Sequence, residues 1–269
     1  MNETQARGAS GMLAALKVGV RVWARTLRVR WAPLLVGTVA YLALIEGSSR
    51  LWDLIPESSA VADWPLWALG GLWRYTLFQL LGAFATLQVL AVVDGRAAGP
   101  RATAMALGHR LVVAVCLAML SGLLVFPIQT YLHGLAQTES RMAVAQVAVL
   151  LNLAGAVVGM AIGVFTCMVM PLAVDRNLST IQAFRAGAGL GARRWGSLLL
   201  TSLLVSLIPA AVGVLALQAS VYLIPYEWIE QNRWFLIWQV RDAPSRFLSL
   251  LAVPLWPAIY VALRQAKPA

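Results

Sequence analysis

The sequence predicts an all-α, polytopic integral membrane protein with six transmembrane helices. Three observations lead to this class: the composition is unusually apolar, long apolar runs recur along the chain, and basic residues flank those runs. Of the 269 residues, 60% are hydrophobic and only 12% are charged, with a mean hydropathy of +0.76. Soluble domains carry about 25% charged residues, so lipid is the predicted solvent for most of this chain.

A spanning helix needs about 20 mostly apolar residues, and six runs come close to or exceed this length. They cover residues 31–49, 70–93, 111–135, 142–174, 195–224 and 247–263. The fourth and fifth runs are longer than one crossing needs, so we expect them to tilt, to project beyond the bilayer or to include interfacial turns. The basic region 1–30 is too long for a cleavable signal and is predicted to be a retained amphipathic interfacial helix. The whole chain, 1–269, is therefore predicted to form a single integral membrane domain.

Basic residues are divided unequally between the two sides of this six-span path. The side that carries both termini holds fifteen lysines and arginines, and the other side holds five. By the positive-inside rule, both termini lie in the cytoplasm and the protein is a multi-pass protein of the bacterial inner membrane. The basic residues that give the chain its net charge of +10 flank the apolar runs and do not form one tract. This pattern favours anionic phospholipid as a partner and argues against nucleic acid.

A short, basic, partly amphipathic segment precedes the first, third and fifth runs. All three segments fall on the predicted cytoplasmic side, so the sequence predicts three repeats of surface helix, spanning helix and returning helix. The residues predicted to contact lipid or a partner are Lys17, Arg21, Arg25, Arg28, Arg185, Arg193 and Arg194. The simpler alternative is that these cations only fix the topology.

The first and third of these segments have helical signals. In the first, Lys17, Arg21, Arg25 and Arg28 share about a quarter of the helix circumference, and an apolar stripe runs apart from them through Met12, Leu16, Val20, Trp23 and Leu27. In the third, Ser179 and Gln182 predict a capping box at a helix start. Gly187, Gly189 and Gly191 predict a bend, an early stop or a close contact. Pro100 similarly suits the start of the second surface helix.

Two features lie inside the predicted spans. Gly155, Gly159 and Gly163 recur every four residues, with Asn152 on nearly the same face. This spacing predicts a close helix–helix contact within the chain, with a hydrogen bond from Asn152 across it. Arg74 lies a few residues into the second run, where snorkelling to the outer interface is the favoured interpretation. The alternative for Arg74 is a contact with a substrate or a lipid phosphate.

The chain offers no pattern typical of catalysis. His109 and His133 fall on opposite sides of the membrane, and no zinc-binding His-Glu motif, GxSxG motif or phosphate-binding glycine loop occurs. Asp94 and Asp175 are expected to be solvated loop residues that nothing brings together. The prediction is therefore a protein that is not an enzyme and has no metal and no cofactor, with an intramembrane enzyme as the least favoured class.

The segment "MPLAVDRNLSTIQAFRAGAGLGARRWGSLLL" combines a proline at the end of one span, an acidic turn, a small capped helix, and Arg-Trp at the start of the next span. It resembles uncharacterised bacterial six-helix families related to the YciC-like proteins and to the membrane domain fused to some glycerophosphodiester phosphodiesterases. "LAVVDGRAAGPRATAMALGHRLVVAV" resembles the matching earlier loop. This chain has Gly187 where those families often show a serine, and it lacks a phosphodiesterase domain. The resemblance implies an all-helical inner-membrane protein, and it does not imply the phosphodiesterase reaction.

Two functional classes stay open at this point. The first is a non-catalytic membrane protein that acts through contacts with lipid or a membrane-protein partner, as an accessory or immunity-type factor. The second is a transport permease, in particular an ABC-2-type subunit, which needs a separate ATPase bound at residues 94–110 or 175–194. A stoichiometric ATPase that copurifies with the chain would distinguish the second class from the first.

Overall fold

The computed structural model describes residues 3–53, 64–95, 99–120, 122, 141–223, 248, 250 and 252–265, and these ranges are α-helical apart from short turns. The helices are α1 (Glu3–Asp53), α2 (Trp64–Val93), α3 (Pro100–His109), α5 (Arg141–Thr166), α6 (Val169–Arg176), α7 (Thr180–Arg193), α8 (Trp195–Leu223) and α12 (Leu255–Gln265). A further helical segment covers Leu111–Leu120. The predicted all-α class is confirmed.

Two segments in the described part of the chain are long and apolar enough to cross a membrane. They are Leu16–Ser48 of α1 and Leu69–Val93 of α2. A third is present if α3 and Leu111–Leu120, which meet at a 49° bend, form one broken span. Two or three candidate transmembrane helices therefore correspond to the first three predicted runs. Most of the second half of the third run lies outside the described residues.

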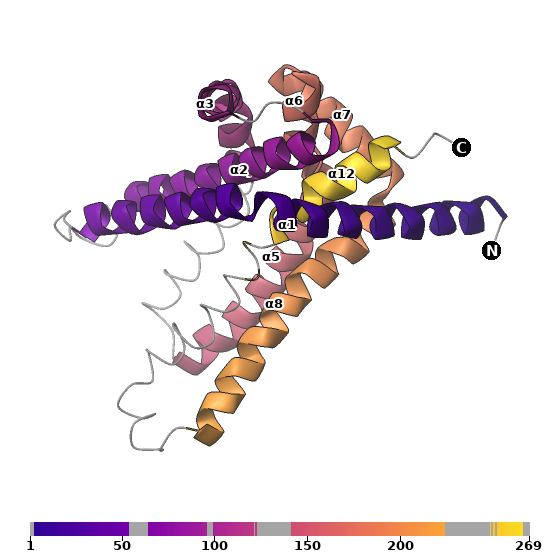
Figure 1. Cartoon of the computed structure of the whole chain (residues 1–269). Helices are drawn as coiled ribbons and strands as arrows, with labels where there is room; N and C mark the ends of the chain where they lie inside the picture. Colours follow the sequence, from indigo (N-terminus) through magenta and orange to yellow (C-terminus); the bar gives the residue numbers. More distant parts are fainter. Residues whose placement is uncertain are drawn as a thin grey trace.

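The helices are arranged in two groups. α1 and α2 lie side by side, and α5 and α8 lie side by side and run away from them (Figure 1). α3, α6 and α7 gather at one end of the molecule (Figure 1). The main buried cluster joins five helices through Val89, Leu90, Val164, Met168, Leu172, Leu198, Ala258, Ile259, Tyr260 and Val261. Helix ends that are far apart in sequence are therefore fixed to one another by apolar packing.

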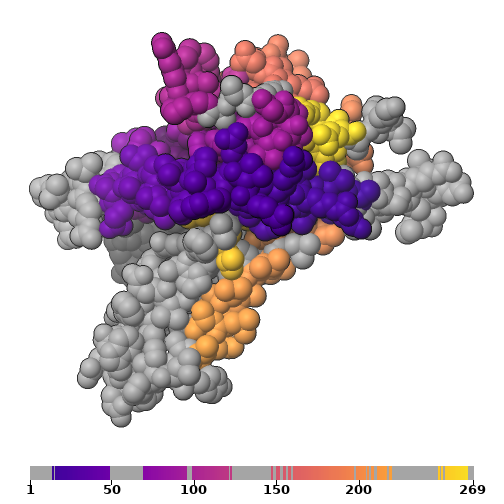
Figure 2. Space-filling view, viewed as in Figure 1, coloured from indigo at the N-terminus to yellow at the C-terminus, as the bar shows by residue number. Residues whose placement is uncertain are grey.

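α1 joins the predicted surface helix and the first span, and the space-filling view shows it crossing the front of the molecule as one unbroken band (Figure 2). Its backbone departs from helical geometry at Arg30, with φ −119° and ψ 25°. Leu16 and Trp23 pack against the main buried cluster. A Cβ added at Gly19 would lie 3.1 Å from Ile259 Cα of α12. Part of the apolar stripe predicted to face the headgroups therefore contacts the protein itself.

The fourth predicted run, residues 142–174, is two helices and not one. α5 ends at Thr166, a turn follows, and α6 begins at Val169. Pro171 explains the break, because a proline has no N–H to bond the carbonyl four residues earlier and its ring clashes with that carbonyl. The carbonyl concerned belongs to Cys167, which lies in the turn. A turn was one of the outcomes expected for this run, and the structure has a turn there.

α3 and α7 begin as predicted. Pro100 occupies the first position of α3. At the start of α7, the Gln182 main-chain N–H donates to Ser179 Oγ at 3.5 Å, and the Ser179 N–H donates to Gln182 Oε1 at 3.2 Å. Both hydrogen bonds of the capping box are present. These bonds satisfy amide hydrogens that a helix start otherwise leaves without a partner.

Ser179→Ala is expected to lower the free energy of unfolding by about 1 kcal/mol, because it removes the side-chain acceptor of this cap. Ser179→Asp keeps an acceptor at the same position and should stay close to the wild type. Thermal unfolding of the detergent-solubilised protein measures both variants. Equal losses in the two variants would show that the cap does not stabilise α7.

Candidate functional site

An arginine lies at the junction between each predicted surface helix and the helix that follows it. These junction arginines are Arg30, Arg110 and Arg194. Their (φ, ψ) angles are −119° and 25°, −102° and 0°, and −125° and 19°. Each one directly precedes a predicted span. The shared backbone conformation supports the threefold repeat predicted from the sequence.

The returning helices of the three repeats also end in a similar way. Asp94, Asp175 and Arg264 lie at these ends, 64, 65 and 70 residues after the junction arginine of their own repeat. The structure brings the three side chains together. Arg264 Nη2 donates to Asp94 Oδ1 at 2.6 Å, and Arg264 Nη1 donates to Asp175 Oδ1 at 3.1 Å. We call these three residues the ion triad.

Burial and a fourth side chain strengthen the ion triad. The Asp175 side chain is only 4% exposed, whereas those of Arg264 and Asp94 are 24% and 22% exposed. Tyr260 Oη donates to Asp175 Oδ2 at 2.7 Å. The buried Asp175 carboxylate therefore has both a cation and a neutral donor, as a buried charge requires.

The expectation that nothing brings Asp94 and Asp175 together is wrong. It considered each loop separately, but the shared partner Arg264 is 170 residues from Asp94 and 89 residues from Asp175. Hydrogen bonding to Asp94 raises the pKa of Arg264 above its ordinary value, burial opposes this effect, and the charges of Asp175 and Asp94 add to it. Arg264 is thus a cation at every pH at which the folded protein can be studied.

The second junction has its own polar contact. Arg110 is buried, and its Nη2 donates to Asn177 Oδ1. Asn177 ends α6 in the left-handed conformation, with φ 52° and ψ 40°, which asparagine tolerates better than most residues. Burial lowers the pKa of Arg110. This contact, which we did not predict, ties the second repeat's junction to the α6–α7 loop.

The predicted lipid- or partner-binding cations are largely at the surface. Arg194 is half-buried at its junction, and the other six are exposed. Arg101 on α3 is also exposed. We call the resulting group the exposed basic set, and its members are Lys17, Arg21, Arg25, Arg28, Arg101, Arg185 and Arg193. Cations therefore project from all three surface helices.

The predicted packing stripe lies on α5. The structure does not describe the surroundings of Asn152 and Gly159. Gly155 is half-buried. A Cβ added at Gly163 would meet no described atom within 4 Å. Among the described residues, Gly163 therefore does not provide the predicted close contact.

The close contact expected from the glycines of α7 is present. A Cβ added at Gly191 would lie 2.8 Å from both Phe165 Cα and Val164 O, and one at Gly187 would lie 2.5 Å from Val169 Cγ2. These glycines let α7 lie directly on the end of α5 and the start of α6. α7 neither bends nor stops at the glycines and continues to Arg193.

Arg74 lies near one end of α2, and Asp94 of the ion triad directly follows the other end. It is exposed near the start of α2, next to Trp73, which is 42% exposed. Twenty residues separate Arg74 from Asp94, which corresponds to about 30 Å along a helix. The snorkelling interpretation and the ligand interpretation of Arg74 both stay predictions.

In the described ranges no group of three or more His, Cys, Asp or Glu side chains is arranged to hold a metal ion. His109 is exposed at the end of α3, and His133 lies outside those ranges. The two carboxylates that do meet are bonded to Arg264. Arg264 thus links the ends of α2 and α6 through these two carboxylates.

No protein-family model, curated protein or solved structure matches this chain. The resemblance of its two loops to bacterial six-helix families stays a prediction that depends on those residues alone.

Proposed function

We propose that this chain is a non-catalytic protein of the bacterial inner membrane that acts through contacts with anionic phospholipid or a membrane-protein partner, as an accessory or immunity-type factor. The exposed basic set carries the proposal, because its cations project from three separate surface helices. Each cation near an anionic leaflet contributes on the order of 1 kcal/mol. Seven such residues are enough to select anionic lipid around the protein.

The proposed topology has six spans and both termini in the cytoplasm. Two spans lie between Asp94 and Asp175 in this path, and two more lie between Asp175 and Arg264. An even number of crossings returns the chain to the same side, so contacts within the ion triad support this path. α5 and α8, with 26 and 29 residues, are long enough to serve as spans.

A reporter fused behind residue 185 tests this topology. It is expected to be inaccessible from the periplasm, because α7 and the ion triad both belong to the cytoplasmic side in the proposed path. A periplasmic reporter at this position would overturn the topology and, with it, the assignment of the exposed basic set to the inner leaflet.

Changing Lys17, Arg21, Arg25 and Arg28 together to glutamine is expected to lower the amount of copurifying phosphatidylglycerol several-fold, since four favourable charge interactions are lost. Lipid extraction and mass spectrometry of the detergent-purified protein give the measurement. A matched variant with lysine at positions 21, 25 and 28 keeps the charge and should retain the lipid. Unchanged lipid content in the glutamine variant would contradict the proposal.

One observation favours the second candidate, an ABC-2-type permease. Ile181 on α7 is 75% exposed, one turn before the exposed Arg185. A large apolar side chain among cations on a capped surface helix is suited to docking a protein. If purification in mild detergent from native membranes yields a stoichiometric ATPase that Ile181→Glu releases, the permease is supported. If no ATPase copurifies, the lipid-contact function is supported.

A further inference from the structure

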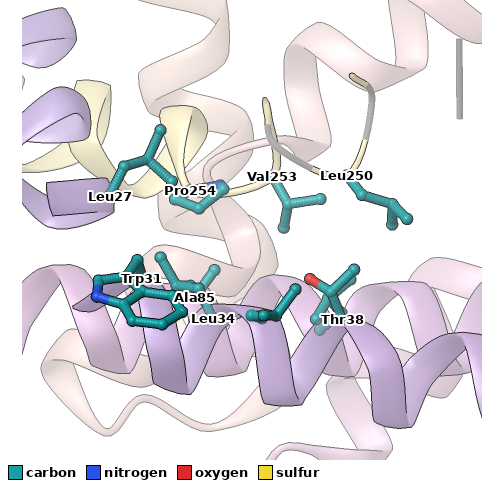
Figure 3. A pocket seen from close by; sticks show the side chains of 10 residues that line it. Leu27, Trp31, Leu34, Thr38, Ala85, Leu250, Val253 and Pro254 are labelled. Atoms are coloured by element: carbon teal, nitrogen blue, oxygen red, sulfur yellow. The ribbon is translucent and has the colours of Figure 1, made fainter. Parts of the chain in front are cut away.

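An apolar groove with a volume of about 240 Å³ lies between α1, α2 and the segment that leads into α12 (Figure 3). α1 lines it with Leu27, Trp31, Leu34, Leu35 and Thr38. Ala85 of α2 and Val253 face α1 across the groove and belong to the buried cluster beneath it. Among the described lining residues, the Thr38 hydroxyl and the Trp31 indole N–H are the only polar side-chain groups.

The groove is long and open to the surface. From Leu27 to Thr38 it follows α1 for about 16 Å, because a helix rises 1.5 Å per residue. Trp31 and Leu35 on its rim are 63% and 49% exposed. This segment belongs to a candidate span, so the open side faces hydrocarbon. An elongated groove with almost no hydrogen-bonding groups suits an acyl chain and not a polar solute.

Arg28 and Arg30 lie between Leu27 and Trp31, which line one end of the groove. Arg28 is exposed, and Arg30 is partly exposed at the break in the α1 helical geometry. Arg30 Nε is buried and has no hydrogen-bond partner. Buried donors normally have a partner, and Arg110 at the equivalent junction reaches Asn177. Within the part of the chain that the structure describes, Arg30 Nε is therefore a buried donor without an acceptor.

We propose that the α1–α2 groove binds one anionic phospholipid, with an acyl chain along Leu27 to Thr38 and the phosphate on Arg30. Arg28 adds a second positive charge at the same end. This inference rests on the proposed function and deepens it, because it assigns one lipid to one site. The net negative headgroup of an anionic lipid selects this occupant over a zwitterionic lipid, whose headgroup adds a cation that the two arginines repel.

Native mass spectrometry of the detergent-purified full-length chain, incubated with phosphatidylglycerol or phosphatidylcholine, tests the site. The wild type is expected to retain one phosphatidylglycerol and to prefer it over phosphatidylcholine. Arg30→Gln removes a charged hydrogen-bond donor and should weaken retention about tenfold. Leu35→Trp fills the groove from its exposed rim and should weaken retention to a similar extent.

Two variants serve as matched controls. Val39→Trp introduces the same side chain at a position on α1 that is 56% exposed and is not a lining residue of the groove. Arg176→Gln removes an exposed cation that is not in the exposed basic set, from α6, a helix that does not line the groove. Both should retain the lipid like the wild type. Thermal unfolding of every variant confirms that it is folded before its lipid content is compared.

Each result separates the groove from the wider proposal. If Leu35→Trp matches Val39→Trp, or if Arg30→Gln matches Arg176→Gln, the groove is not the site. Loss of lipid in the four-glutamine variant would still support the proposed function. If neither the wild type nor any variant prefers phosphatidylglycerol over phosphatidylcholine, both proposals are overturned. If the wild type binds a second copy of the chain and Leu35→Trp releases that copy, the groove is a protein contact and the lipid site is overturned.

Discussion

Arg264→Gln is expected to lower the free energy of unfolding by about 2–3 kcal/mol, because it leaves the nearly buried Asp175 carboxylate without its cation. This expected loss of stability is smaller than for a fully buried ion pair, because the Arg264 side chain is 24% exposed. The midpoint of thermal unfolding in detergent should fall by about 5–10 °C. Tryptophan fluorescence during heating is a suitable measurement, because the chain contains 11 tryptophans.

Two further variants show whether the charge interactions are the cause. The triple variant Asp94→Asn, Asp175→Asn and Arg264→Gln removes all three charges and should be more stable than Arg264→Gln alone. Arg193→Gln removes an exposed cation from α7 and should change stability by less than about 0.5 kcal/mol. If Arg264→Gln is no less stable than Arg193→Gln, the ion triad does not hold the three helix ends together.

Gly191→Ala is expected to destabilise the protein by about 1–3 kcal/mol. The new Cβ would lie 2.8 Å from Phe165 Cα and from Val164 O, and both are main-chain atoms that cannot rotate away. α7 must then move off α5. The same thermal unfolding measurement in detergent detects the loss.

Gly189→Ala provides the opposite result two positions earlier on the same helix. A Cβ at Gly189 would meet no described atom within 4 Å, so alanine only restricts the unfolded chain there. We expect Gly189→Ala to stabilise the protein by about 0.5–1 kcal/mol. Shifts of the same sign in both variants would show that α7 does not lie on α5 as described.

Local signals in the sequence predicted the local features of this fold. The capping box of Ser179 and Gln182 and the helix start at Pro100 each depend on residues within one helical turn, and both are present. The expected beginnings of the spans at residues 31, 111 and 195 also coincide with the junctions found at Arg30, Arg110 and Arg194. Hydrophobicity changes abruptly at these positions, which makes them visible in the sequence.

Features that depend on distant residues were not predictable in this way. Nothing near Asp94 or Asp175 indicates that Arg264 bonds both, because the three lie in different repeats. A close contact was one outcome predicted for the glycines of α7, and it occurs at Gly187 and Gly191, whereas a Cβ added at Gly163 would meet no described atom within 4 Å. Spacing identifies glycines that can allow a close approach, whereas the position of the neighbouring helix decides which glycine is used. The break before α6 was only one of several outcomes considered, although Pro171 is a local signal for it.

The ion triad also constrains the order in which the protein can mature. A ribosome makes Asp94 and Asp175 well before Arg264, which is 170 residues after the first and 89 after the second. During synthesis neither carboxylate can bond to Arg264 until that residue has been made. The ion triad can therefore join the ends of the earlier helices only after nearly the whole chain has left the ribosome.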